Sequence, residues 1–215
     1  MTLQTMLSTM SEGMLRTCAI FALTLIGSLP LGMVVALLKK SRFALVRGII
    51  NVYISVIRGT PLMLQLLVWY FGPFYLLGLP ISNWRFPALI LGFVINYAAY
   101  FAEIYRGGIE SIPAGQYEAA EVLGYSRAQT FMRIILPQVV KRIMPSVTNE
   151  VITLVKDTSL AFTLAYQEVF SLAKQISASQ TSFMPFLIAG VFYFVANYAV
   201  EFAMARIEKS LDYYK

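Results

Sequence analysis

The side chains best suited to chemistry in this sequence are charged and hydroxyl groups inside long apolar stretches. Asp157 lies in such a stretch and is followed by Thr158 and Ser159, whose hydroxyls can bond the local backbone and interrupt a helix. A carboxylate there can bind an ammonium group or a cationic side chain of a solute. It can equally form a structural pair with Lys156 or Arg58. Irregular backbone at membrane depth persists only where it is buried in protein or lines a watery cavity, so this segment belongs inside the molecule.

A second group of polar side chains is expected near the same depth. Asn96 and Tyr100 are one turn apart on one face of an apolar stretch, and Thr60 and Gln65 belong to another stretch that is interrupted. Together they can form a polar pocket. Each one alone is also explained by hydrogen bonding between helices, and both interpretations remain open at this point.

Two further charged residues have alternative roles. Glu103 is expected near the end of its helix, where it can pair with Arg106 or contact a solute. Arg58 can receive a solute carboxylate, or it can stabilise the helix break beside it. The candidate solute-pathway residues are therefore Asp157, Asn96, Tyr100, Thr60, Gln65, Thr158, Ser159, Arg58 and Glu103.

Several kinds of chemistry are excluded by residue counts. The 215 residues include no histidine and one cysteine, so no Ser-His-Asp or Cys-His nucleophile and no imidazole-based metal site can be built. No phosphate-cradling GxxxxGK[ST] loop is present, so any ATP must be bound by another polypeptide. We expect no catalytic residue, no metal and no cofactor in this chain.

The elements that position these residues are membrane-spanning helices. Hydrophobic residues make up 58% of the chain and charged residues 13%, against about 25% charged residues in soluble domains. The mean hydropathy is +0.68. Because a span needs about 20 mostly apolar residues, the sequence predicts an all-α integral membrane protein with five transmembrane helices in one domain, residues 1–215. The predicted spans are residues 17–38, 48–71, 87–105, 143–164 and 184–205, of which the second is broken at 58–61.

The basic residues predict the orientation. Most Lys and Arg residues outside the spans follow the first, third or fifth span. Positive loops stay in the cytoplasm, which places the N-terminus outside and the C-terminus inside. The net charge of +6 is explained in this way, and we expect no binding to nucleic acid. The charged flank follows the first apolar run instead of preceding it, which favours a retained span over a cleaved signal peptide.

A long cytoplasmic segment, residues 107–142, separates the third and fourth spans. Residues 118–123 are strong helix formers, Gly124 can adopt a left-handed turn, and Ser126 can cap a second helix. We expect that second helix to end at Pro137. Its apolar stripe consists of Ala128, Phe131, Ile134 and Ile135.

This helix–glycine–helix segment resembles the Glu-Ala-Ala loop of ATP-binding cassette importer permeases. The matching positions are Glu118, Ala119, Ala120, Gly124 and Leu136-Pro137. Other stretches are similar to the polar amino-acid branch of that family, of the histidine, glutamine or arginine type. They are IRGTPLMLQ at 57–65, YFAEIYRGGI at 100–109 and NEVITLVKDTSL at 149–160.

The resemblance implies that the loop couples the chain to an ATPase. Its first helix would lie in a cleft of an ATPase subunit, where small alanines permit close approach and Glu118 offers an acceptor. Without the resemblance, an amphipathic helix resting on lipid explains the loop equally well. The implied coupling residues are Glu118, Ala119, Ala120, Gly124 and Arg127.

The resemblance also implies partners and a location. They are an ATPase dimer, a second identical or homologous permease subunit and an extracytoplasmic amino-acid-binding protein, around a multi-pass chain in the bacterial cytoplasmic (inner) membrane. The implied function is the membrane-spanning permease of an ATP-driven, binding-protein-dependent importer of polar amino acids that works by alternating access.

Two other classes are weaker alternatives. An ATP-independent secondary carrier or channel for small polar solutes needs an ion relay, yet the spans contain few carboxylates and no histidine. It also leaves the structured inner loop without a role. A membrane-embedded enzyme needs a nucleophile with a base or a set of metal ligands, and none is evident.

Overall fold

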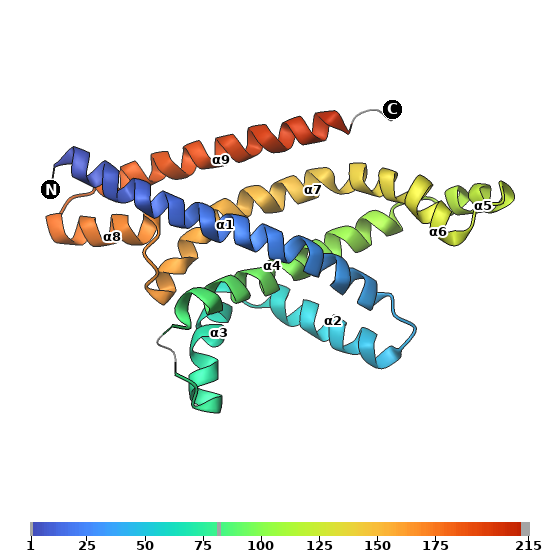
Figure 1. The fold of residues 1–215 in the computed structure, drawn as a ribbon, viewed down its shortest axis with the longest axis horizontal. Helices are drawn as coiled ribbons and strands as arrows, with labels where there is room; N and C mark the ends of the chain where they lie inside the picture. Colours follow the sequence, from blue (N-terminus) through green and yellow to red (C-terminus); the bar gives the residue numbers. More distant parts are fainter. Residues whose placement is uncertain (1, 81–82, 212–215) are drawn as a thin grey trace.

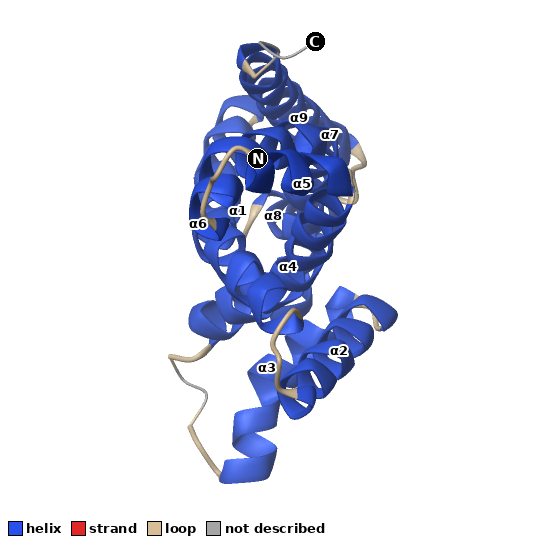
Figure 2. Cartoon of the chain, turned by 90° about the vertical axis from the view of Figure 1, so that its right-hand side faces the viewer, coloured by secondary structure: helices blue, strands red, loops and turns tan. Residues whose placement is uncertain are grey.

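The computed structural model describes residues 2–80 and 83–211, and the fold they form is all-helical, without a strand (Figures 1 and 2). This confirms the predicted helical class. Three helices are long and apolar enough to cross a membrane, which is consistent with an integral membrane protein. They are α1 (Leu3–Lys39), α4 (Arg85–Glu110) and α9 (Met184–Ser210). Each contains one predicted span and extends beyond it.

The predicted break in the second span is confirmed, and it changes the direction of the chain sharply. Helix α2 (Ala44–Gly59) and helix α3 (Leu62–Leu77) meet at Thr60 and Pro61 with a bend of 114°. Proline lacks a backbone N–H and disfavours helical geometry in the residue before it, so one helix ends here and another begins. Figure 2 shows that both helices lie to one side of the main bundle.

The fourth predicted span, residues 143–164, corresponds to two elements of different geometry. They are α7 (Leu136–Asp157) and the 3₁₀ helix η2 (Thr158–Leu164). Neither is among the helices that pass as spans by length and composition, because α7 carries polar residues along one side. By that measure the described residues contain three spans, or four if the bent pair is one span.

The long segment between the third and fourth predicted spans consists of α5 (Ala114–Val122), the short α6 (Arg127–Thr130) and the π-helix η1 (Phe131–Ile135), which continues directly into α7. The prediction that Pro137 ends this helix is wrong. Pro137 lies in the first turn of α7, immediately after the wider π turns. A proline is tolerated there because the changed hydrogen-bond register absorbs its missing N–H.

The core lies between α1 and α4, which cross each other in extensive contact (Figure 1). A Cβ atom on Gly32 of α1 would lie 2.8 Å from Cβ of Phe101, and one on Gly27 would lie 2.7 Å from Cγ2 of Val94. The missing side chains therefore let the two backbones approach. The buried aromatic residues Phe93, Tyr97 and Phe101 of α4 fill the adjoining space. This packing fixes the positions of the polar groups on α4.

The last described helix before α9 is α8 (Val169–Gln180), which packs against α1 and α9. Its N-cap is Glu168, a fully buried residue whose carboxylate accepts hydrogen bonds from Ser171 N (2.6 Å), Phe170 N (2.7 Å) and Tyr193 Oη (2.8 Å). Burial raises the pKa of the Glu168 carboxyl, and these hydrogen bonds act in the opposite direction. Glu168 thus ties the N-terminus of α8 to α9.

Two adjacent glycines provide a matched test of the contact between α4 and α7. A Cβ atom on Gly108 would lie 2.1 Å from Cγ2 of Ile143, whereas one on Gly107 would meet nothing within 4 Å. We expect Gly108→Ala to lower the free energy of unfolding by about 1–3 kcal/mol, because Ile143 is branched and buried. Gly107→Ala should leave it unchanged or raise it slightly. Thermal unfolding in detergent measures both, and equal stability of the two variants would contradict this close packing.

Candidate functional site

Helix α7 has one polar, accessible side, which is unusual next to the apolar helices around it. Its opposite side is buried against the rest of the fold through Ile143, Val147, Val151 and Leu154. The residues of the accessible side are spaced at helical intervals, and Glu150 and Asp157 among them are partly buried. The polar side consists of Arg142, Ser146, Asn149, Glu150, Thr153 and Asp157.

The end of α7 is organised around Asp157, as its sequence predicts. The helix ends at this residue, and the hydroxyls of Thr158 and Ser159 donate to the carbonyls of Val155 (2.6 Å) and Lys156 (2.7 Å). The predicted ion pairs with Lys156 and Arg58 are absent from the described residues. Their place is taken by Tyr97, whose buried Oη donates to Asp157 Oδ2 at 2.7 Å.

Tyr97 was not among the predicted site residues. Only its position in an apolar helix next to Asn96 marks it in the sequence. The partnership depends on how α4 packs on α7, which no local spacing reveals. The hydrogen bond stabilises a partly buried carboxylate and leaves the second carboxylate oxygen available.

The predicted group of Thr60, Gln65 and Asn96 is brought together at the break between α2 and α3. Gln65 Nε2 donates to Ile57 O (2.8 Å), Thr60 O (3.0 Å) and Thr60 Oγ1 (2.9 Å), and Asn96 Nδ2 donates to Gln65 Oε1 (2.9 Å). Gln65 is 7% exposed and Asn96 4%. The two side-chain amides are therefore engaged in hydrogen bonds between helices. The Gln65 amide also binds the backbone carbonyls of Ile57 and Thr60, which the break leaves without a helical partner.

Arg58 and Tyr100 do not belong to that amide cluster. The Arg58 guanidinium lies 5.2 Å from the centre of the Tyr100 ring, a cation–π contact between α2 and α4. Both side chains line a cavity of about 440 Å³ between α4 and α7, which also borders on Glu150. The cavity thus brings Arg58, Tyr100 and Glu103 together with Glu150, which is not among the predicted site residues.

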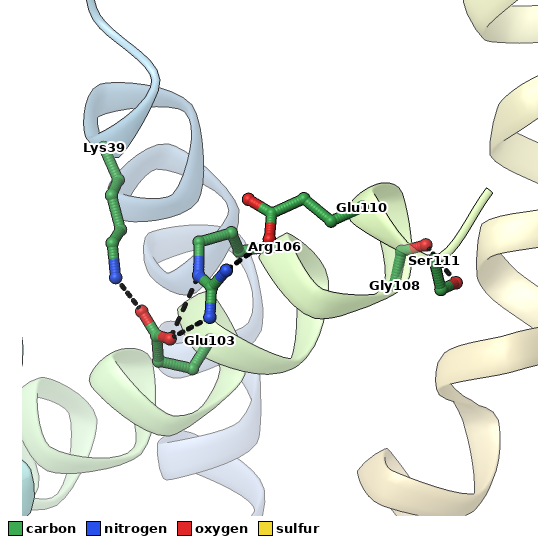
Figure 3. Close-up of polar contacts among 6 residues, drawn as sticks. All are labelled: Lys39, Glu103, Arg106, Gly108, Glu110 and Ser111. Atoms are coloured by element: carbon green, nitrogen blue, oxygen red, sulfur yellow. Dashed lines mark hydrogen bonds and ion pairs between the residues drawn. The ribbon is translucent and has the colours of Figure 1, made fainter. Parts of the chain in front are cut away.

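Glu103 forms the predicted ion pair and a second one that was not predicted (Figure 3). Arg106 donates to Glu103 Oε2 through Nε (3.1 Å) and a terminal nitrogen (2.7 Å), and Lys39 of α1 pairs with Glu103 Oε1. Arg106 also pairs with Glu110. The network joins the C-terminal ends of α1 and α4, so the structural interpretation accounts for Glu103.

The segment that resembles a coupling loop projects from the bundle at the end opposite α8 (Figure 1). Gly124 has a φ of 77°, as expected for a left-handed elbow. Ser126 caps α6: its hydroxyl accepts from Gln129 N (3.3 Å), and Gln129 Oε1 accepts from Ser126 N (2.9 Å). Glycine and capping box fix the angle between the two helices.

The predicted coupling residues differ in accessibility. Glu118, Ala119 and Arg127 are exposed, whereas Ala120 is 1% exposed and packs inside the loop. The methyl group of Ala120 therefore faces this chain's own residues, and Ala119 is the exposed alanine of the pair. In the described part of the chain no group of three metal-ligating side chains occurs.

The sequence matches the profile of a family described as binding-protein-dependent transport system inner membrane component, over residues 28–213. It is 38% identical to the arginine transport system permease protein of Bacillus subtilis, over 93% of this chain and 91% of that protein. It is 33% identical to the L-cystine transport system permease protein of Bacillus subtilis, over 95% and 87%.

Solved structures with the same fold are also known. A crystal structure of an amino acid ABC transporter with histidines has 30% sequence identity and a TM-score of 0.87, covering 98% of this chain and 99% of that one. An inward-facing methionine ABC transporter has 17% identity and a TM-score of 0.69, with the same coverage, and shows the similarity of fold alone.

Proposed function

The chain belongs to the family of binding-protein-dependent transport system inner membrane components, and on that premise we propose that it is the permease subunit of an ATP-driven importer of polar amino acids. Two of its relatives are named as permease proteins of arginine and L-cystine transport systems, which supports amino acids as the substrate class. ATP is bound and hydrolysed by a separate subunit, since this chain lacks a phosphate-binding loop.

The observation that carries the transport path is the polar side of α7. Arg142, Glu150 and Asp157 stand on one accessible side of a helix whose buried side is apolar. Charged groups at membrane depth are too costly to face lipid, so this side lines a watery route. The cavity beside Glu150 supports the same conclusion.

The charges of this route fit an amino acid. Apart from the paired Glu103 and Arg106, and from Arg142 at the far end of the cavity, Glu150 and Asp157 supply two carboxylates and Arg58 supplies one guanidinium. A zwitterion with a cationic side chain carries the complementary set of two positive groups and one negative group. Asp157, supported by Tyr97, would receive the ammonium or the side-chain cation, with Thr158 and Ser159 shaping the turn beside it.

We place five spans in the membrane, with the N-terminus outside and the C-terminus in the cytoplasm. The distribution of basic residues supports this orientation. Helix α7 then counts as a span in spite of its polar side. That side faces the route, and the opposite side packs against the protein. The location is the bacterial cytoplasmic (inner) membrane.

Helix α5 would couple this route to the ATPase. Glu118 and Ala119 are exposed at the tip of the projecting loop, and the loop reaches α4 and α7 directly at its two ends. A movement of α5 therefore acts on both helices that border the cavity. Two ATPase subunits, a second permease subunit and an extracytoplasmic binding protein complete the assembly, and ATP and binding protein favour different states of it.

Dependence on a partner ATPase distinguishes an importer from a secondary carrier. We expect the chain to purify with an ATPase, and uptake into liposomes to require ATP and binding protein. A partner ATPase variant that binds ATP without hydrolysing it should abolish accumulation, whereas an imposed proton or sodium gradient should not restore it. Accumulation driven by a gradient without the ATPase would contradict the proposal and support a carrier.

A further inference from the structure

The cavity between α4 and α7 extends past Glu150 toward the coupling loop. Its far end is lined by Ser111, at the end of α4, and by Arg142 and Ser146, at the start of α7. Ser111 is also the residue after which the chain turns toward α5. This end of the cavity therefore lies on the cytoplasmic side of the proposed route.

The three arginines that line the cavity differ in how their charge is compensated. Arg106 is bound by Glu103 and Glu110, and Arg58 lies over the Tyr100 ring near Glu150. Arg142 donates to the backbone carbonyl of Ser111, a neutral acceptor. Among the described residues no carboxylate pairs with Arg142.

The guanidinium of Arg142 therefore keeps donors for another acceptor. A guanidinium presents several N–H donors in a planar fork that matches a carboxylate. One of them is used by Ser111. The cavity end thus offers an uncompensated positive charge with the geometry that binds a carboxylate.

Two further polar side chains, Ser146 and Glu150, follow Arg142 along the cavity-lining side of α7. Ser146 lies one turn from Arg142, and Glu150 lies one turn beyond Ser146, so Arg142 and Glu150 are about 12 Å apart along the axis. All three are accessible from the cavity. A cation, a hydroxyl and a carboxylate in this order complement the carboxylate and the positive group of an α-amino acid.

We propose that Arg142 and Ser146, together with Glu150, which this position shares with the one nearer Asp157, form a second binding position for an α-amino acid, at the cytoplasmic end of the cavity, in which Arg142 holds the α-carboxylate. The position rests on the proposed function, because it lies on the same route. The amino acid reaches it from the route above or from the cytoplasm below. An amino acid that accumulates inside occupies this position, obstructs release and slows import.

The assembled complex in liposomes, with ATP and the probe inside, tests this position. L-Arginine and L-argininamide, which lacks the carboxylate, are placed inside at graded concentrations while ATPase activity stimulated by binding protein is measured. We expect L-arginine to inhibit, and L-argininamide to need about tenfold higher concentration, because a charge-assisted pair is lost. Arg142→Gln should raise the inhibitory concentration of L-arginine about tenfold, and Arg142→Lys should raise it less.

A second arm distinguishes the two sources of the amino acid. Single-turnover release of labelled L-arginine is measured with no amino acid inside. A change in release rate in Arg142→Gln shows that the position is filled from above, and an unchanged rate together with relieved inhibition shows filling from the cytoplasm. Both outcomes support the position.

Several outcomes would overturn the proposal. Equal inhibition of wild type and Arg142→Gln, or equal potency of L-argininamide and L-arginine, would remove Arg142 as a carboxylate receptor. Loss of assembly in both Arg142→Gln and Arg142→Lys would identify a structural residue. ATP-driven uptake that is normal and insensitive to internal L-arginine would refute this position alone, whereas absence of ATP-driven uptake would refute the proposed function.

Discussion

Replacing Glu118 with Lys is expected to reduce ATP-driven uptake at least about tenfold while the helices stay folded. Glu118 is exposed on α5, at the tip of the loop that projects from the bundle (Figure 1). A carboxylate there can accept hydrogen bonds from a docked ATPase, and a reversed charge facing the same partner group costs several kcal/mol of binding free energy, where about 1.4 kcal/mol is tenfold. Uptake into liposomes and binding of the ATPase in detergent measure the effect.

Glu121→Lys is the matched control for this variant. Glu121 is exposed on the same helix, and its replacement makes the same change in charge one turn away. We expect it to retain most of the uptake. Unchanged uptake in Glu118→Lys would count against the coupling role of α5. An equal loss in both variants would show that the overall charge of the loop matters and that Glu118 makes no specific contact.

The loop also shows which features can be predicted from sequence. The Gly124 elbow and the Ser126 cap were predicted because each depends on residues within one turn, and their geometry follows from the types of those residues. The effect of Pro137 was not predicted. A π-helix precedes it, and the wider hydrogen-bond register of that element has no marker in composition or spacing.

The same distinction holds for the site. The end of α7 at Asp157 and the pairing of Glu103 with Arg106 lie within one helical turn and were predicted correctly. The contacts of Tyr97 with Asp157 and of Lys39 with Glu103 join residues far apart in the chain. They depend on the rotation and depth of one helix against another, which the apolar periodicity of the helices leaves undetermined.

The sequence does not mark Glu150 as a site residue, for a related reason. In the sequence it is one of several polar residues that interrupt a predicted span. Only the structure shows that these interruptions gather on one side of α7, while the opposite side is packed against the protein. The polar residues that make this predicted span less apolar than the others are the ones that line the proposed route.

Asp157→Ala tests whether this route binds the solute. We expect stimulation of ATPase activity by loaded binding protein to fall about tenfold or more, since a charged partner of the solute is removed at membrane depth, while the complex still assembles. Helix α7 should keep its shape, because the hydroxyls of Thr158 and Ser159 still bond the backbone where it ends. ATPase assays with purified complex and size-exclusion chromatography measure the two effects.

Two further variants separate the charge of Asp157 from its hydrogen bond. Asp157→Asn keeps an acceptor for Tyr97 but removes the charge, and Tyr97→Phe keeps the charge but removes the 2.7 Å hydrogen bond. If the carboxylate binds a cationic group, Asp157→Asn should lose stimulation nearly as fully as Asp157→Ala, and Tyr97→Phe should lose much less. If Asp157 serves only to join α7 to α4, the order reverses: Asp157→Asn behaves as wild type, and Tyr97→Phe and Asp157→Ala lose assembly and stimulation together.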